Sequence, residues 1–210
     1  MLKLIKKKWN PFYRLIYYKL YKGNRRFRNK FLKPFVGSCS KIGITPNMIT
    51  SFRLFLTIMF FILYNTHKTT AIILVTASLL LDSFDGVLAR HMRRMSDKGK
   101  FLDISVDIFT VFLIASTFIS YSVEPLLIIF FIILFGHTNI FAIIYFNEYK
   151  KTNWIIKPRA NSAFLYYPTI IAFYLFNLFN LNYLTLSLQI SVLISGILFV
   201  FYYLGIQMNR

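Results

Sequence analysis

The chain has 210 residues, of which 57% are hydrophobic, and its mean hydropathy is +0.56. This composition excludes an ordinary soluble enzyme and predicts a single integral membrane domain with no second soluble domain. A formal net charge of +18 would suggest nucleic acid for a soluble protein, but the basic residues lie beside apolar segments. We therefore expect binding to anionic lipid headgroups and no nucleic-acid partner, and the single Cys39 excludes an intramolecular disulfide.

Two basic stretches precede the first long apolar segment. Residues 1–22 interleave lysines with aromatic and aliphatic side chains, a pattern typical of an interfacial amphipathic helix, and we assign them as a basic interfacial extension. Residues 24–42 place Phe27, Phe31 and Phe35 at helical spacing among arginines and lysines, which predicts a second helix on the inner membrane surface. Pro34 should kink or divide that helix. The membrane domain is assigned to residues 23–210.

Six segments are apolar and long enough to cross a bilayer, so the predicted fold is all-α, with six transmembrane helices and the N-terminal interfacial amphipathic helix. The expected spans are 48–64, 69–89, 101–121, 125–146, 163–179 and 183–203. Loops 90–100 and 147–159 are basic, whereas loops 122–124 and 180–182 contain no lysine or arginine. The positive-inside rule then places both termini and both basic loops in the cytoplasm, in the plasma membrane if the protein is prokaryotic.

Acidic residues occur at a regular spacing on the second and third expected spans. Asp82 and Asp85 share one helix face with Gly86 and Ala89, and Gly99, Asp103 and Asp107 share one face of the next helix. Each carboxylate at the centre of a spanning helix costs about 2.5–3.5 kcal/mol, so four unpaired carboxylates would oppose insertion by roughly 10 kcal/mol. The sequence therefore predicts a bound partner for this acidic cluster.

A divalent cation is the simplest such partner, because Arg53 and Arg90 are too few to neutralise four carboxylates. Carboxylates without cysteine or a suitably spaced histidine favour a hard ion, Mg²⁺ or Mn²⁺, over zinc. Two alternatives stay open. Asp82 and Asp85 could pair with the two arginines to hold helices together, and Gly86 and Ala89 could be small residues at a helix–helix contact.

The same residues resemble the signature of a known family. The run from Asp82 through Asp85, Gly86 and Ala89 to Arg90, followed at fixed spacing by Gly99, Asp103 and Asp107, is similar to the signature of the CDP-alcohol phosphotransferases. Residues 43–50, with Pro46, Asn47 and Thr50, look like the entry to the first membrane helix of that family. The resemblance is strong at the signature and only architectural beyond Ser120.

The resemblance implies a metal-dependent CDP-alcohol phosphatidyltransferase of phospholipid biosynthesis. Members of the family transfer a substituted phosphate from a CDP-linked donor such as CDP-diacylglycerol to an acceptor hydroxyl and release CMP. By matching position, Asp82, Asp85, Asp103 and Asp107 would hold Mg²⁺ or Mn²⁺, as two ions, and Asp107 would also be the general base. The implied contacts to the donor nucleotide are Asn47, Thr50, Gly86, Arg90, Ser96 and Gly99. The resemblance further implies a homodimer.

The acceptor is the least defined part of this hypothesis. Lys157 and Arg159 lie at the cytoplasmic mouth of the fifth expected span, where basic residues would suit the phosphate of inositol phosphate or glycerol 3-phosphate. A non-phosphorylated acceptor or a lipid alcohol is the alternative, and the donor lipid could be diacyl or ether-linked. A more distant alternative is a cation or proton transporter, which should carry acidic residues along a path through the bilayer.

Overall fold

The computed structural model describes residue 32 and residues 34–94, 96–144 and 159–208. The long elements in these ranges are helices: α2 (Pro46–Leu63), α3 (Lys68–His91), α4 (Asp97–Ser116), the short 3-10 helix η1 (Thr117–Tyr121), α5 (Pro125–Ile144), α6 (Arg159–Phe179) and α7 (Leu184–Gln207). Residues 34–41 are also helical. The all-helical prediction is therefore confirmed for the described part of the chain.

Within the described part of the chain, five helical stretches are long and apolar enough to cross a membrane, by length and composition. They are Pro46–Leu63, Lys68–His91, Phe101–Tyr121, Pro125–Ala142 and Leu184–Gln207. The remaining expected span, 163–179, corresponds to α6, a helix of 21 residues whose described apolar part, Tyr167–Phe179, is shorter than a full crossing. Five of the six predicted spans are thus recovered, and α6 stays a prediction as a span.

The proposed interfacial extension, residues 1–22, lies outside the described residues, and so does most of the second basic stretch. Its described part, residues 34–41, is helical and lies against the start of α2 and the end of α3. Val36 is fully buried there beside Ile49, Val87 and Leu88. This contact places a helix from before the first span next to the end of α3 that carries the aspartates.

Side-chain caps fix where two of the helices begin. Thr45 precedes α2, and its hydroxyl accepts a hydrogen bond from the Met48 amide at 3.3 Å, while Pro46 occupies the first helical turn. Ser96 precedes α4, and its hydroxyl accepts a hydrogen bond from the Gly99 amide at 3.0 Å. Thr50 and Asp103 follow these helix starts and are both buried.

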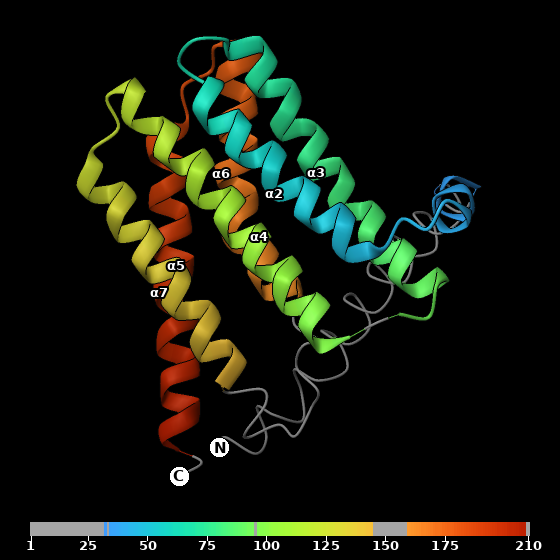
Figure 1. Ribbon diagram of the computed structural model, residues 1–210. Coiled ribbons are helices and arrows are strands. Elements are labelled where there is room, and N and C mark those ends of the chain that lie inside the picture. The colour runs from blue at the N-terminus through green and yellow to red at the C-terminus, as the bar shows by residue number, and fades with distance from the viewer. Residues whose placement is uncertain (1–31, 33, 95, 145–158, 209–210) are drawn as a thin grey trace.

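The helices form an up-and-down bundle in which α2 packs against α3 and α4, α5 packs against α7, and α6 packs against α7 and α4 (Figure 1). The turn between α3 and α4 lies at the same end of the bundle as the start of α2 and the last turn of α7 (Figure 1). Asp82 and Asp85 are near the end of α3, and Asp103 and Asp107 are near the start of α4. All four aspartates therefore lie toward one end of the bundle.

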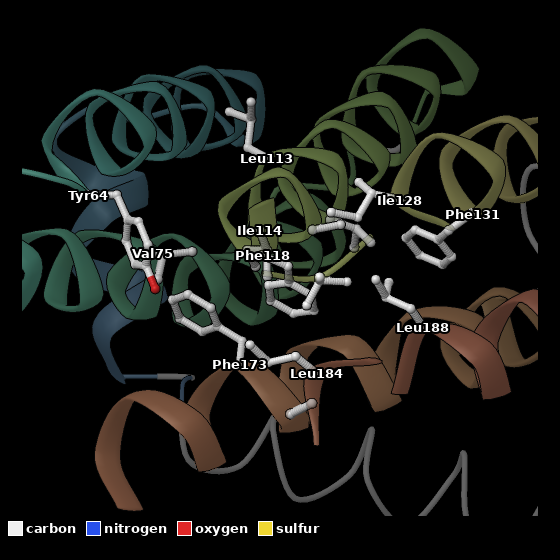
Figure 2. Close-up of a cluster of buried hydrophobic side chains, with 14 of the residues drawn as sticks. Tyr64, Val75, Leu113, Ile114, Phe118, Ile128, Phe131, Phe173, Leu184 and Leu188 are labelled. Carbon is white, nitrogen blue, oxygen red and sulfur yellow. The ribbon is translucent and has the colours of Figure 1, made fainter. Parts of the chain in front are cut away.

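The largest apolar core occupies the other half of α3 and α4. Figure 2 shows Phe118 near the middle of this cluster, with Phe173 of α6 and Leu184 of α7 below it. Tyr64, at the end of α2, and Val75, in the first half of α3, belong to the same cluster. The bundle is thus divided lengthwise into an apolar half that fixes the helix packing and a half that contains the carboxylates.

Candidate active site

The guanidinium of Arg53, on α2, lies at the centre of the acidic cluster. The side chain is only 1% exposed. Its Nη1 atom donates to Asp85 Oδ2 and Asp103 Oδ1, both at 2.9 Å, and lies 3.3 Å from Asp82 Oδ1. Its Nη2 atom donates to Asp107 Oδ1 at 2.6 Å. One cation from α2 thus contacts two carboxylates from α3 and two from α4.

The four aspartates differ in burial. Asp85 and Asp103 are buried, whereas the side chains of Asp82 and Asp107 keep 30% and 26% of their surface exposed. The cluster therefore has a closed side, formed by Asp85, Asp103 and Arg53, and a side open to a ligand. The gathering of all four carboxylates at one point agrees with the spacing of the sequence motif.

Three of these carboxylates are arranged in a way that fits a metal ion. Asp82, Asp85 and Asp103 each offer an oxygen within 4.8 Å of the other two. The buried Asp82 Oδ1 atom lies 3.3 Å from Arg53 Nη1 but accepts no hydrogen bond from the residues that the structure describes, so it retains a lone pair for a ligand. An all-carboxylate oxygen set suits Mg²⁺ or Mn²⁺. Asp107, also predicted to be a ligand, lies outside this group of three.

Thr50, expected at the donor nucleotide, has two partners within the protein. Its hydroxyl lies 3.0 Å from Asp85 Oδ2 and 3.1 Å from the Pro46 carbonyl oxygen one turn earlier in α2. Asp85 Oδ2 therefore receives hydrogen bonds from both Thr50 and Arg53. The structure places Thr50 so that it orients a carboxylate of the cluster.

A buried network of hydrogen bonds holds Arg53 in place next to the carboxylates. Its Nε atom donates to the Ser78 carbonyl at 3.3 Å, and the Ser78 hydroxyl donates to the Arg53 carbonyl at 3.1 Å. The Thr57 hydroxyl lies 2.9 Å from that of Ser78 and 3.2 Å from that of Thr110. These contacts join α2, α3 and α4 next to the carboxylates. The buried hydroxyl groups find their hydrogen-bond partners in one another and in the backbone, so no water is needed to satisfy them.

Three of the residues assigned to the donor nucleotide lie close together where α2 and α4 begin. A Cβ atom built on Gly99 would come within 3.0 Å of Asn47 Oδ1 and 3.1 Å of Ser96 Oγ. Both distances are tighter than most real Cβ contacts, so a side chain at this position would require Asn47 and Ser96 to shift by a few tenths of an ångström. Ser96 itself caps α4 through the Gly99 amide. Sequence reasoning did not foresee this capping contact, although Ser96 stands three residues before Gly99.

Gly86 and Arg90 lie one turn apart on α3. A Cβ atom built on Gly86 would meet only Arg90 Nη1, at 3.5 Å, among the described residues. Among the helices that the structure describes, none other than α3 itself comes within 4 Å of this position, so they give no support to the alternative interpretation of Gly86 as a helix-packing residue. Its half-buried backbone lies beside a guanidinium, an arrangement that suits a negatively charged ligand.

The acceptor residues cannot be placed in the same way. Lys157 lies outside the described residues, and Arg159 opens α6 without a described side chain. Their role stays a prediction.

The main residue that sequence reasoning undervalued is Arg53. The sequence indicates Arg53 as a possible partner for Asp82 and Asp85, but Arg53 and Arg90 together are too few to neutralise four carboxylates. The available signal was its position inside an apolar span, where a charge requires a partner. Periodicity could not show that α2 turns this side chain toward both α3 and α4.

Comparison with known proteins adds an independent line of information. A family profile described as CDP-alcohol phosphatidyltransferase matches residues 43–202, which include all four aspartates and Arg53. A protein of Aquifex aeolicus (strain VF5), named only as an uncharacterized protein, is 38% identical over 85 residues. That match covers 40% of this chain and 43% of the relative, less than half of its length. No solved structure matches the chain significantly.

Proposed function

The chain belongs to the CDP-alcohol phosphatidyltransferase family, and we propose that it transfers a phosphatidyl-type group from a CDP-linked lipid to an acceptor hydroxyl, releasing CMP. The observation that carries this proposal is the convergence of Asp82, Asp85, Asp103 and Asp107 on one point at the end of a membrane bundle. Clustered carboxylates beside a partly open surface suit the binding of a metal–diphosphate complex.

In this proposal Asp82, Asp85 and Asp103 hold Mg²⁺ or Mn²⁺, and Asp107 shares in a site for two ions. The bound ions would neutralise charge on the phosphoryl oxygens. Asp107 accepts the proton of the acceptor hydroxyl as that oxygen attacks the phosphorus atom next to the lipid. Its partly exposed carboxylate can reach a ligand, and Arg53 Nη2 fixes its orientation from the buried side.

The nucleotide part of the donor is proposed to lie between the start of α2 and the facing ends of α3 and α4. Gly86 and Gly99 allow it to approach the helix backbones, while Asn47 and Ser96 lie beside Gly99. Arg90 would neutralise charge on the diphosphate. Thr50 would act mainly through Asp85, with which it shares a hydrogen bond.

The acceptor is proposed to be a polyol phosphate, such as inositol phosphate or glycerol 3-phosphate, held by Lys157 and Arg159. Arg159→Ala should reduce the preference for a phosphorylated acceptor over the free alcohol, because it removes a positive charge near the phosphate. Competition between inositol 1-phosphate and free inositol measures this preference directly. An unchanged preference would favour the alternative of a non-phosphorylated acceptor.

The wider arrangement belongs to the same proposal. We place the active site and both termini in the cytoplasm, treat α6 as a membrane span in addition to the five others, and expect the protein to form a homodimer. The basic loop 90–100 beside the aspartates supports this orientation through the positive-inside rule.

The decisive experiment measures CMP release by the purified protein from CDP-diacylglycerol with Mg²⁺. Glycerol 3-phosphate, inositol 1-phosphate, free inositol and serine are offered one at a time. Release that depends on one acceptor and stops in excess chelator would support the reaction and the metal. Activity in excess chelator would refute the metal assignment. No release with any acceptor, combined with cation flux in proteoliposomes, would favour the transporter alternative.

A further inference from the structure

Arg53 contacts the same carboxylates that would hold a metal ion. Its Nη1 atom lies 2.9 Å from Asp85 Oδ2, 2.9 Å from Asp103 Oδ1 and 3.3 Å from Asp82 Oδ1. These three aspartates are also the group whose oxygens lie close enough together to ligate one ion. A single nitrogen atom of Arg53 therefore contacts the carboxylates whose oxygens a metal ion would need as ligands.

We propose that Arg53 is an internal counter-ion that holds the four carboxylates together before a divalent ion binds, and that it competes with that ion for the oxygens of Asp82, Asp85 and Asp103. This inference rests on the metal site of the proposed function. It makes Arg53 a positioning residue, because it acts on the carboxylates and does not itself touch the reacting atoms.

The charges explain why both roles are possible. Four carboxylates around one guanidinium keep an excess of negative charge, so Arg53 stabilises the cluster without neutralising it. In a poorly solvated site, unpaired carboxylates at these distances repel one another strongly. The same excess leaves the cluster attractive to a divalent ion, while the positive charge of Arg53 opposes the entry of another cation.

The anchoring of Arg53 shows which contacts would change. Its Nε atom is bonded to the Ser78 carbonyl and its Nη2 atom to Asp107, and neither partner belongs to the group of three oxygens. These two contacts can persist when the Nη1 contacts to Asp82, Asp85 and Asp103 are lost. Competition is therefore confined to one nitrogen, and it does not require the whole side chain to leave the site.

A direct role in binding the phosphates of the substrate fits the structure less well. Arg53 is 1% exposed and is surrounded by carboxylates, which would repel a diphosphate. The half-buried Arg90, one turn beyond Gly86, is better placed for that purpose.

The test uses the full-length protein purified in detergent and compares the wild type with Arg53→Met, Arg53→Lys and the control Arg94→Met. Arg94 is exposed in the turn between α3 and α4 and lies outside the cluster. Two quantities are measured without substrate: the thermal unfolding midpoint in excess chelator, and the affinity for Mn²⁺ alone by electron paramagnetic resonance.

In chelator, Arg53→Met should lower the unfolding midpoint by at least about 4 °C relative to Arg94→Met, and added Mn²⁺ should remove most of that difference. Its affinity for Mn²⁺ should be about tenfold higher than that of the wild type, because a competing cation has been removed. Arg53→Lys keeps the charge but makes fewer hydrogen bonds, so both effects should be smaller and in the same direction. If Arg53→Met does not fold, the unfolding midpoint and the Mn²⁺ affinity of Arg53→Lys test the inference.

Three results would overturn the inference. An unchanged midpoint in chelator would show that the carboxylates do not need Arg53, and weaker or equal Mn²⁺ binding by both variants would show that Arg53 does not compete with the metal. Failure of the wild type to bind Mn²⁺ would remove the metal site itself. By contrast, a wild type that binds Mn²⁺ competitively with Arg53 but releases no CMP would contradict only the proposed reaction.

Discussion

Asp107 differs from the other three aspartates in the atom of Arg53 that it contacts. It meets Arg53 Nη2, whereas the other three aspartates meet Nη1, and it lies outside the group of three potential ligands. Asp107→Asn should therefore lower the rate of CMP release by about 10²–10⁴-fold, the usual contribution of a general base, while retaining most Mn²⁺ binding. Initial rates at saturating Mg²⁺, combined with Mn²⁺ titration, check both statements.

Asp97→Asn provides a matched control for Asp107→Asn, since Asp97 begins α4 and is not one of the four aspartates of the sequence signature. It should retain the wild-type rate. Full activity of Asp107→Asn would refute the assignment of the base, and complete loss of Mn²⁺ binding would make Asp107 an essential metal ligand instead.

Gly86 allows donor binding to be separated from protein stability. Since a Cβ atom there would meet only Arg90 Nη1, at 3.5 Å, Gly86→Ala should leave the thermal unfolding midpoint unchanged or slightly raised. If the CDP-linked donor approaches this backbone, the added methyl group should raise its KM about tenfold. Gly136→Ala on α5, where a Cβ atom has open space, should affect the midpoint in the same way and leave the KM for the donor unchanged. An unaltered KM in Gly86→Ala would remove Gly86 from the donor site.

At the level of helices, α2, α3 and α4 are joined by hydroxyl groups beneath the carboxylates. Ser78 donates to the Arg53 carbonyl and Thr110 to the Val106 carbonyl, so the single proton of the Thr57 hydroxyl is left to bridge to one of them, Ser78 on α3 or Thr110 on α4. Thr57→Val keeps the shape of the side chain and removes this bridge, which should cost about 1 kcal/mol. The thermal unfolding midpoint should fall by about 2–4 °C.

The exposed Thr66, in the turn after α2, offers a Thr→Val control that should leave the unfolding midpoint unchanged. Equal midpoints for Thr57→Val and the wild type would show that the bridge contributes nothing to the packing of the three helices.

The sequence predicted the helices more completely than the contacts between them. The expected span 48–64 corresponds to α2, Pro46–Leu63, because apolar length and the Thr45–Pro46 start are local features. The expected span 101–121 includes a change to the 3-10 helix η1 at Thr117, which no local composition signals. The placement of Arg53 between Asp85 and Asp103 depends on how separate helices cross, which periodicity within one helix does not determine.

For the whole molecule, charge and architecture together predict an orientation in the membrane. The turn between α3 and α4 contains Arg93 and Arg94 and lies at the end of the bundle near the carboxylates, whereas the loop 122–124 at the other end contains no lysine or arginine. Short basic loops stay in the cytoplasm. In a Cys39→Ser background, an impermeant maleimide added to spheroplasts should label Ser122→Cys at once. It should label Arg94→Cys only after permeabilisation, and the reverse pattern would place the carboxylates on the outer side, away from a cytoplasmic nucleotide donor.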